Sequence, residues 1–361
     1  MAALGGSGTI SEVAEFKILV DASVGVKADA MTVAFDATKF GRHMADETTE
    51  AGIDEAWKAA KRANPRLYNG SKFRFSGGAV SKDGSARLDI GLTDVKAYRT
   101  TNLAATAHEL EAKGKAAGSA HKFLADPLEC TVVLESTDGF VPLLLRPGHA
   151  KHAPGAVDTP VGTPEPSAVG IPLNAVVVVG APAKARRPGR AAAFDPASVG
   201  GEVVTQLFDS ALSEVADELN LESEKVRGQT FLGVVRGVKT PGMLSAVFYA
   251  KYSGTLGDLQ ARYALGSKDQ QSSALILAPA TQLLSVNTTE PGVNVSGCRA
   301  MQSEGGDAAP ATAAPAPSED EDKTSDVNSD DICPCTKAAL ELWRMHKQKL
   351  AARRRSTAGF L

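Results

Sequence analysis

The chain has 361 residues, of which 43% are hydrophobic and 22% charged, and its formal net charge is −3 at pH 7. Such a length accommodates two domains or one large domain with insertions. The near-neutral charge argues against nucleic acid or an anionic membrane as the partner. No run approaches the ~18 consecutive apolar residues of a membrane span, and the N-terminal residues lack the pattern of a secretory signal.

The cysteine content is low. Cys130, Cys298, Cys333 and Cys335 are too few for a disulfide framework, and the Cys-Pro-Cys at 333–335 lacks the paired spacing of a zinc site. We therefore expect reduced thiols in a cytoplasmic protein, with the nucleus as the alternative compartment.

Strand-like and helix-like patterns alternate along the chain. In the first 145 residues we expect a strand at 16–20, a helix at 50–62, strands at 73–75 and 86–92, a helix at 103–116, and strands at 131–134 and 141–145. Further on we expect a helix at 203–221, strands at 229–238 and 244–253, a helix at 256–263, a strand at 274–278 and a helix at 336–355. This order predicts an α/β (α+β) protein with helices on both faces of a sheet.

Two segments have compositions typical of loops. Residues 178–202 are rich in Pro, Gly and Ala, and residues 303–331 are rich in Ala and Pro and then acidic. Neither segment carries enough apolar side chains to offset the entropy of ordering it. We expect both to be insertions, the second one disordered.

The helix predicted at 203–221 carries three carboxylates within little more than one turn. Glu214 and Glu218 are four residues apart and therefore share a face, and Asp217 lies beside them. Like charges at this spacing destabilise a helix by a few tenths of a kcal/mol per pair. A hard divalent cation such as Mg²⁺, which takes carboxylate and phosphate oxygens together, would reverse that penalty. An acidic, solvated helix face is the other interpretation.

Two stretches together resemble the Nudix box, a glycine-containing loop followed by a helix that ends in a carboxylate motif. The stretches are DTPVGTPEP at 158–166 and SEVADELNL at 213–221. Ser213 replaces the arginine of the box, Asp217 replaces a glutamate, and Asn220 replaces a glycine. Asn tolerates the left-handed conformation that this last position requires.

Segments outside the box extend the resemblance from about residue 15 to about residue 345, and the string is similar to the UDP-glucose diphosphatase subfamily of Nudix hydrolases. They are Trp57, KFRF (72–75), GLT (91–93), TN (101–102), LADPL (124–128), PGAVDTPVGTPEP (154–166), VVTQLFDSALSEVADELNL (203–221), LGVVR (232–236), AVFY (246–249) and CPCTKAAL (333–340).

The resemblance implies a Nudix fold, a mixed sheet sandwiched between helices, with a divergent N-terminal α/β domain. It implies the following division: a flexible N-terminus at 1–14, a family-specific domain at 15–145, a Nudix domain at 146–302 with an insertion at about 169–202, the acidic insertion at 303–331, and a C-terminal helix at 332–355 that packs on the Nudix domain.

The resemblance also implies an activity, the Mg²⁺-dependent hydrolysis of UDP-glucose or UDP-galactose to UMP and a sugar 1-phosphate, with Mn²⁺ as the alternative metal. Glu214, Asp217 and Glu218 match the catalytic carboxylates, and Glu214 and Glu218 match the metal ligands. The residues implied to bind the nucleotide sugar are Tyr68, Arg146, Asp158, Thr163 and Glu165.

Two other functions remain open from the sequence. The first is a catalytically silent Nudix protein that binds nucleotide sugars as a sensor or scaffold. This hypothesis stays open because Ser213 and Ala168 stand where the box has an arginine and a glutamate. The other is a Nudix hydrolase that acts on another dinucleotide or on CoA.

Overall fold

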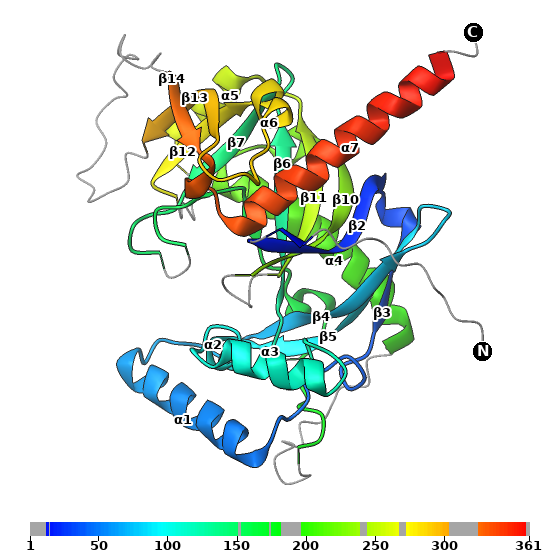
Figure 1. Ribbon diagram of the computed structural model, residues 1–361, viewed down its shortest axis with the longest axis vertical. Coiled ribbons are helices and arrows are strands. Elements are labelled where there is room, and N and C mark those ends of the chain that lie inside the picture. The colour runs from blue at the N-terminus through cyan, green and yellow to red at the C-terminus, as the bar shows by residue number, and fades with distance from the viewer. Residues whose placement is uncertain are drawn as a thin grey trace.

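The computed structural model describes residues 12–13, 15–150, 153–172, 175–181, 196–238, 244–266, 272–302 and 324–358. Within these ranges the protein is mixed α/β, with three sheets and seven α-helices (Figure 1). The class expected from the alternating patterns is therefore confirmed.

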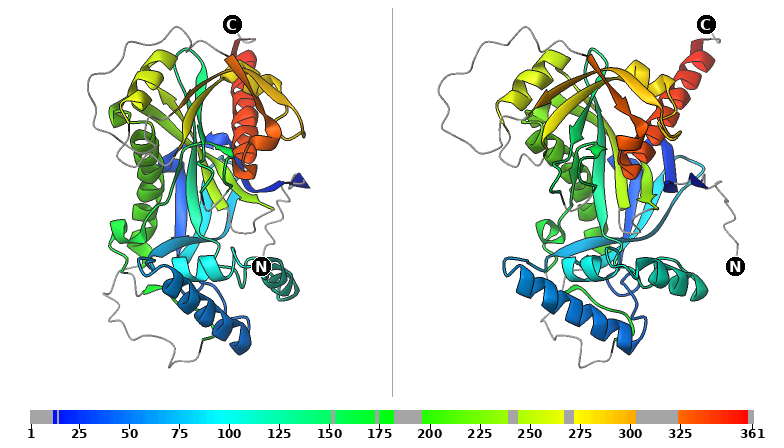
Figure 2. Two further views of the ribbon diagram at one scale, coloured as in Figure 1. Left: turned by 90° about the vertical axis from the view of Figure 1, so that its left-hand side faces the viewer. Right: turned by 60° about the vertical axis from the view of Figure 1, so that its left-hand side comes forward.

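The central sheet has six strands. Their order is β1 (Glu12–Val13), β2 (Phe16–Val26), β10 (Val226–Gly237), β11 (Leu244–Tyr252), β6 (Leu128–Glu135) and β9 (Val161–Gly162). β6 and β11 run parallel, and the other neighbours are antiparallel. Helices α4 (Pro196–Glu218) and α7 (Pro334–Ala358) lie on opposite faces of this sheet (Figure 2).

The alternation of side chains along β6 explains the two layers. Val132 and Leu134 belong to the core under α4, whereas Val133 belongs to the core under α7. Both faces of the strand are apolar because both are covered by a helix. Trp343 of α7 is fully buried in the core between this helix and the central sheet.

A five-stranded sheet lies beside the central one. Its order is β14 (Thr324–Asn328), β13 (Asn294–Gln302), β12 (Ala274–Pro279), β7 (Phe140–Leu145) and β8 (Val157–Asp158). Two short helices, α5 (Leu256–Ala264) and α6 (Ala280–Ser285), flank β12 in the sequence. Thr255 and Asp258 form a capping box at the start of α5.

The third sheet contains β3 (Met31–Phe35), β5 (Ala86–Asp94) and β4 (Ser71–Val80), in that order. Three helices lie at the end of this sheet that is farther from α7 (Figure 1): α1 (Glu47–Ala63), α2 (Val95–Thr100) and α3 (Ala107–Ala116). The helix expected at 103–116 begins at Ala107, and residues 101–106 form turns and a bend that precede it.

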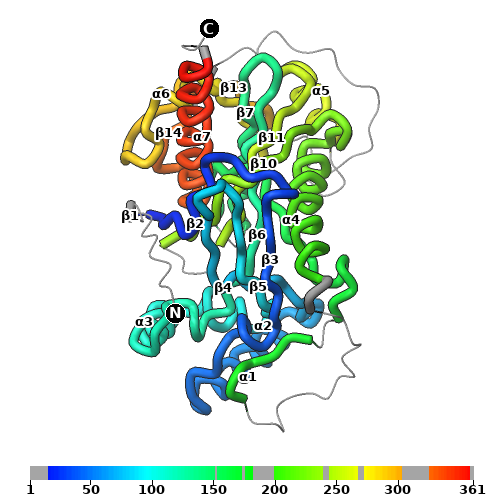
Figure 3. Tube along the Cα trace, turned by 90° about the vertical axis from the view of Figure 1, so that its right-hand side faces the viewer, coloured from blue at the N-terminus to red at the C-terminus, as the bar shows by residue number. Residues whose placement is uncertain are grey.

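Helix α4 spans the third sheet and the central sheet (Figure 3). Near its beginning, Gly200 lies against β3, where a Cβ atom would come within 2.4 Å of the Val33 carbonyl oxygen. At its end, Asn220 adopts a left-handed conformation with φ 52°. The Leu221 N–H donates to the Ala216 carbonyl at 2.8 Å, which closes a Schellman motif. The sequence predicted this conformation at Asn220.

A buried polar cluster joins the third sheet to the central sheet. Asp126, fully buried, accepts a 2.7 Å hydrogen bond from Asn102 Nδ2, and its Oδ2 lies 2.5 Å from His121 Nδ1. Arg236 Nη2 of β10 is 3.7 Å from Asp126 Oδ1, and Arg74 Nη1 of β4 donates to the Phe40 carbonyl at 2.8 Å. Burial raises the pKa of Asp126, but Arg236, His121 and Arg74 together hold it below its usual value.

The strand pairing corrects two of the expected boundaries. β2, β6 and β7 lie within the expected 15–145 domain, yet they pair with β10, β11 and β12 of the following domain. Residues 324–331, expected to be disordered, form β14 and a 3₁₀ turn because β13 supplies an antiparallel partner. Residues 303–323, most of the predicted segment 1–14, and residues 173–174 and 182–195 of the predicted segment 169–202 lie outside the described residues.

Candidate active site

The end of α4 presents its carboxylates to two different environments. Glu214 and Glu218 are half-buried against the loop that follows β8, whereas Ser213 and Asp217 are exposed. A helix turns about 100° per residue, so Glu214, Asp217 and Glu218 cover an arc of about 100°, and Asp217 lies at one edge of it. The structure therefore brings Glu214 and Glu218 together and leaves Asp217 at the solvent side.

Gly162 makes the close approach of Glu214 to β9 sterically feasible. A Cβ atom at position 162 would lie 1.8 Å from Glu214 Cγ and 2.8 Å from Glu214 Cβ. Steric contact with Glu214, and not backbone conformation, therefore excludes a side chain here, since the φ angle of Gly162 is not in the positive range. This glycine belongs to the DTPVGTPEP loop, so loop and carboxylate helix meet as the two halves of a Nudix box should.

Glu218 lies among negative charges. It accepts a hydrogen bond from the Val161 N–H at 3.3 Å. Burial and the charges of Asp158 and Glu214 raise the pKa of Glu218, while the Val161 N–H and Arg146 lower it, and the net result is a pKa of about 8. A cation placed between Glu214 and Glu218 would favour the ionised form of both groups.

A divalent metal fits these two glutamates if other ligands complete its shell. Within the described residues no group of three or more His, Cys, Asp or Glu side chains is placed to hold a metal. Mg²⁺ is commonly bound by one or two carboxylates, with waters and substrate phosphates as its remaining ligands. The pair Glu214 and Glu218 meets that requirement.

An ion pair is buried beside the carboxylates. Arg146, which follows β7, donates from Nε to Asp158 Oδ2 at 2.7 Å and from Nη2 to the same oxygen. The other oxygen of Asp158 accepts from Thr336 Oγ1 in the first turn of α7. Burial lowers the pKa of the Arg146 guanidinium, but Asp158 raises it above its usual value overall. Asp158 is 3% exposed, and both of its oxygens are engaged in holding Arg146 and α7.

The remaining loop residues that the sequence singled out lie closer to solvent. Thr163 is half-buried, and Glu165 is exposed. Lys72 Nζ at the start of β4 lies 3.4 Å from Glu165 Oε1. This contact connects the 158–166 loop to the third sheet.

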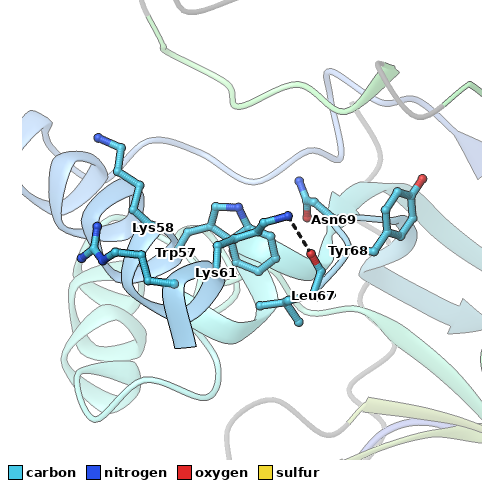
Figure 4. A pocket seen from close by; sticks show the side chains of 7 residues that line it. Trp57, Lys58, Lys61, Leu67, Tyr68 and Asn69 are labelled. Atoms are coloured by element: carbon cyan, nitrogen blue, oxygen red, sulfur yellow. Dashed lines mark hydrogen bonds between the residues drawn. The ribbon is translucent and has the colours of Figure 1, made fainter. Parts of the chain in front are cut away.

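Tyr68 lies on the turn that follows α1. It is 63% exposed and lines a cavity of about 520 Å³ between α1 and the 64–69 turn. The Tyr68 ring points away from the Trp57 indole, and Lys61 Nζ reaches across to the Leu67 carbonyl at 3.1 Å (Figure 4). The structure thus places no second aromatic ring opposite Tyr68 in this cavity.

Three residues at the site were missed by sequence reasoning: Glu129, Gly162 and Thr336. Glu129 had a visible signal, a charged residue in the otherwise apolar strand LECTVVL. Gly162 is one glycine among 34, and only its contact with Glu214 distinguishes it. The bond from Thr336 to Asp158 joins segments 178 residues apart, which no local pattern reveals. All four cysteines are free and buried, as expected.

Comparison with known proteins identifies the class. No family model matches the chain. The chain is 31% identical to the human uridine diphosphate glucose pyrophosphatase NUDT22 over 240 residues, which cover 64% of this chain and 73% of the human protein. It is 30% identical to NUDT22 of Mus musculus over 240 residues, covering 64% of this chain and 71% of that protein. Nudix hydrolase 9 of Arabidopsis thaliana is 24% identical over 295 residues, 79% of this chain and 90% of the plant protein.

The chain is therefore a hydrolase of the Nudix family. Within that family it is homologous to the uridine diphosphate glucose pyrophosphatases NUDT22. Among the described residues, no helix has both the length and the hydropathy needed to cross a membrane.

Proposed function

We propose that this protein is a Mg²⁺-dependent pyrophosphatase that hydrolyses UDP-sugars, UDP-glucose and UDP-galactose, to UMP and a sugar 1-phosphate. In this proposal the central sheet between α4 and α7 is the core of a Nudix fold. Mn²⁺ is the alternative metal. The homology to NUDT22 supports the substrate class.

The observation that carries the proposal is the convergence of Glu214 and Glu218 with the Arg146–Asp158 ion pair. These groups come from α4, from the end of β7 and from β8, and all are at least partly buried. A diphosphate needs its charge neutralised and its reacting phosphorus held in place. Two carboxylates for a metal and one planar guanidinium for phosphate oxygens provide both kinds of contact.

Each side chain then has a defined task. Water adds to one phosphorus atom, and the bond from that atom to the bridging oxygen breaks. A metal held by Glu214 and Glu218 supplies charge neutralisation and a more acidic water. Arg146 binds phosphate oxygens, and Asp158 fixes the direction of its guanidinium. Asp217 adds negative charge at the exposed side of the helix.

The substrate residues outside this centre are assigned by their exposure. Thr163 and Glu165 line the loop beside Gly162 and offer hydrogen bonds to the sugar. Tyr68 presents a free ring face, and stacking of a base on an aromatic ring contributes ~1–3 kcal/mol.

The test is to incubate the full chain with UDP-glucose, ADP-ribose or CoA, each with and without Mg²⁺, and to separate the nucleotide products. We expect UMP from UDP-glucose only when metal is present. Absence of UMP with both Mg²⁺ and Mn²⁺ would refute the proposal. Preferential cleavage of ADP-ribose or CoA would assign the protein to another substrate class.

A matched pair of variants tests the metal assignment. Glu218→Gln removes one proposed ligand with little change of volume, and Glu224→Gln makes the same change at an exposed position of the 3₁₀ turn Ser223–Lys225. We expect the first to lower kcat at least 100-fold and the second to leave it unchanged. Calorimetric binding of UDP-glucose to the wild type without UMP release would identify a silent binding protein instead.

A further inference from the structure

Glu129 occupies a place on β6 that none of the roles above explains. Its neighbours Leu128 and Cys130 face α4, and the Cys130 thiol lies 3.6 Å from the Leu207 carbonyl of that helix. By the alternation of a strand, Glu129 faces the other way, with Thr131, Val133 and Glu135. This second face of β6 is the one that α7 covers.

Partners hold the polar side chains that follow Glu129 on this face. Thr131 Oγ1 lies 2.5 Å from Thr159 Oγ1, and the Thr159 N–H donates to Thr336 Oγ1 of α7 at 3.1 Å. Glu135 accepts from Lys347 Nζ at 2.7 Å. Glu129 is one step beyond Thr131, towards the start of α7, and is half-buried.

The carboxylate of Glu129 has no such partner. It accepts no hydrogen bond from a described residue and has no ion pair within 4 Å among them. Burial raises the pKa of Glu129, Arg146 lowers it, Asp158 raises it and Lys72 lowers it, and the net result is a pKa of about 7. Asp158, by contrast, has both oxygens engaged. Among the described residues, Glu129 thus retains its full capacity to accept hydrogen bonds.

The position relative to the proposed metal ligands indicates which part of a substrate Glu129 would meet. Glu214 and Glu218 lie on the α4 side of β6, and Glu129 lies on the α7 side. Strand β9, whose Gly162 packs against Glu214, pairs with β6 at Cys130, the residue that follows Glu129. Arg146 lowers the pKa of both Glu129 and Glu218. If Arg146 holds a phosphate, the side of that phosphate away from the metal is where a sugar ring begins. Carboxylates commonly accept hydrogen bonds from hydroxyl groups of such rings.

We propose that Glu129 accepts hydrogen bonds from ring hydroxyl groups of the nucleotide sugar, beside the phosphate bound by Arg146, and thereby determines substrate affinity. The inference rests on the proposed function for the identity of the substrate. The hydroxyls belong either to the ribose or to the hexose, and the experiment distinguishes these two sources.

The test measures UDP-glucose binding by calorimetry and UMP release by steady-state kinetics, on the wild type, Glu129→Gln, Glu129→Asp and the control Glu224→Gln. Because a hydrogen bond to a charged group changes an equilibrium by about 10- to 100-fold, we expect Glu129→Gln to raise Kd and KM by that factor with kcat within about threefold. We expect Glu129→Asp to recover part of the affinity and Glu224→Gln to match the wild type.

Analogues that each lack one hydroxyl, the 2′- or 3′-hydroxyl of the ribose or the 2-, 3- or 4-hydroxyl of the glucose, identify the contact. The analogue that lacks the contacted hydroxyl should bind the wild type weakly and lose nothing further in Glu129→Gln. If every analogue loses affinity in Glu129→Gln by the same factor as UDP-glucose, Glu129 contacts none of these hydroxyls and the inference is wrong. An unchanged Kd in Glu129→Gln is equally decisive against it.

The outcome for Glu129 is separable from that for catalysis. If the wild type binds UDP-glucose without releasing UMP, the proposed function fails, and the binding data alone decide the role of Glu129. If the wild type neither binds nor cleaves UDP-glucose, both proposals are overturned.

Discussion

Replacement of Gly162 by alanine tests whether the carboxylate helix and the 158–166 loop form one site. The new Cβ would lie 1.8 Å from Glu214 Cγ and 2.8 Å from Glu214 Cβ, where an ordinary contact is 3.4–4 Å. Rotation of the Glu214 side chain relieves the first clash and leaves the second. Strand β9 and helix α4 must then separate by about half an ångström.

The expected magnitude follows from these two displacements. Overpacking of a well-packed interior costs ~1–3 kcal/mol, so the free energy of unfolding should fall by that amount. A misplacement of a catalytic group by about 1 Å lowers a rate by about 100-fold. We therefore expect Gly162→Ala to lose about 100-fold in UMP release, with a smaller change in KM.

Urea unfolding and UMP release measure the two effects separately. Gly201→Ala is the matched control, because it makes the same change in α4 at a position with no atom within 4 Å of the added Cβ; it should raise stability by about 0.5–1 kcal/mol. In a Glu214→Ala background most of the clash disappears, so the stability loss from Gly162→Ala should shrink. Wild-type stability and activity in Gly162→Ala would show that Glu214 does not pack against β9.

Three further changes probe the charges and the backbone of the structure. In metal-free protein, the pKa of Glu218 rises from 4.5 to about 8 on folding, so the contribution of Glu218 to the free energy of unfolding falls as pH increases from about 4.5 to 8. In urea unfolding, Glu218→Gln should therefore make the free energy of unfolding depend less on pH over this range. An identical pH dependence in the variant and the wild type would refute the shift. Asp126→Ala leaves Arg236 buried without its carboxylate and should cost about 3–5 kcal/mol, while Asp209→Ala at an exposed position of α4 should change stability by less than about 0.5 kcal/mol; equal effects would contradict the buried cluster. Asn220→Ala and Asn220→Gly both remove the hydrogen bond from Asn220 Nδ2 to the Arg262 carbonyl. Because alanine at φ 52° is disfavoured and glycine is not, Asn220→Ala should be about 1–2 kcal/mol less stable than Asn220→Gly in the same assay; equal stabilities of the two variants would contradict the left-handed conformation.

The elements of the fold were predictable because they depend on local periodicity. The strand expected at 229–238 is β10, Val226–Gly237, and the helix expected at 203–221 is α4, which begins earlier and ends at Glu218. Strand pairing was not predictable, because it depends on contacts between distant residues. β6 pairs with β11 in a parallel register that joins Leu128 to Leu244, and for this reason the expected domain boundary at 145 divided one sheet.

The same distinction holds for the candidate site. The shared face of Glu214 and Glu218 follows from their spacing of four residues, and the structure confirms it. The exposure of Asp217 does not follow from spacing, because a residue three positions after Glu214 also lies beside it on the helix. The partners of Asp158 could not be derived in this way, since Arg146 and Thr336 approach it from a strand end and from a helix near the other end of the chain.

The buried cluster explains why segments outside the Nudix box carried the more specific resemblance. Arg74 belongs to KFRF, Asn102 to TN, Asp126 to LADPL and Arg236 to LGVVR, and the structure brings all four segments together around one fully buried carboxylate. Each of these side chains is buried and polar, so a change at one leaves another without its partner.

The end of α4 has fewer buried polar side chains that depend on a partner than the cluster around Asp126. Ser213 and Asp217 point to solvent, so substitutions at these two positions disturb no buried contact. The cluster lies between the third sheet and the central sheet, and α4 and the Lys72–Glu165 ion pair connect the same two parts. The cluster therefore fixes the third sheet relative to the 158–166 loop, on which the position of Glu214 against Gly162 depends.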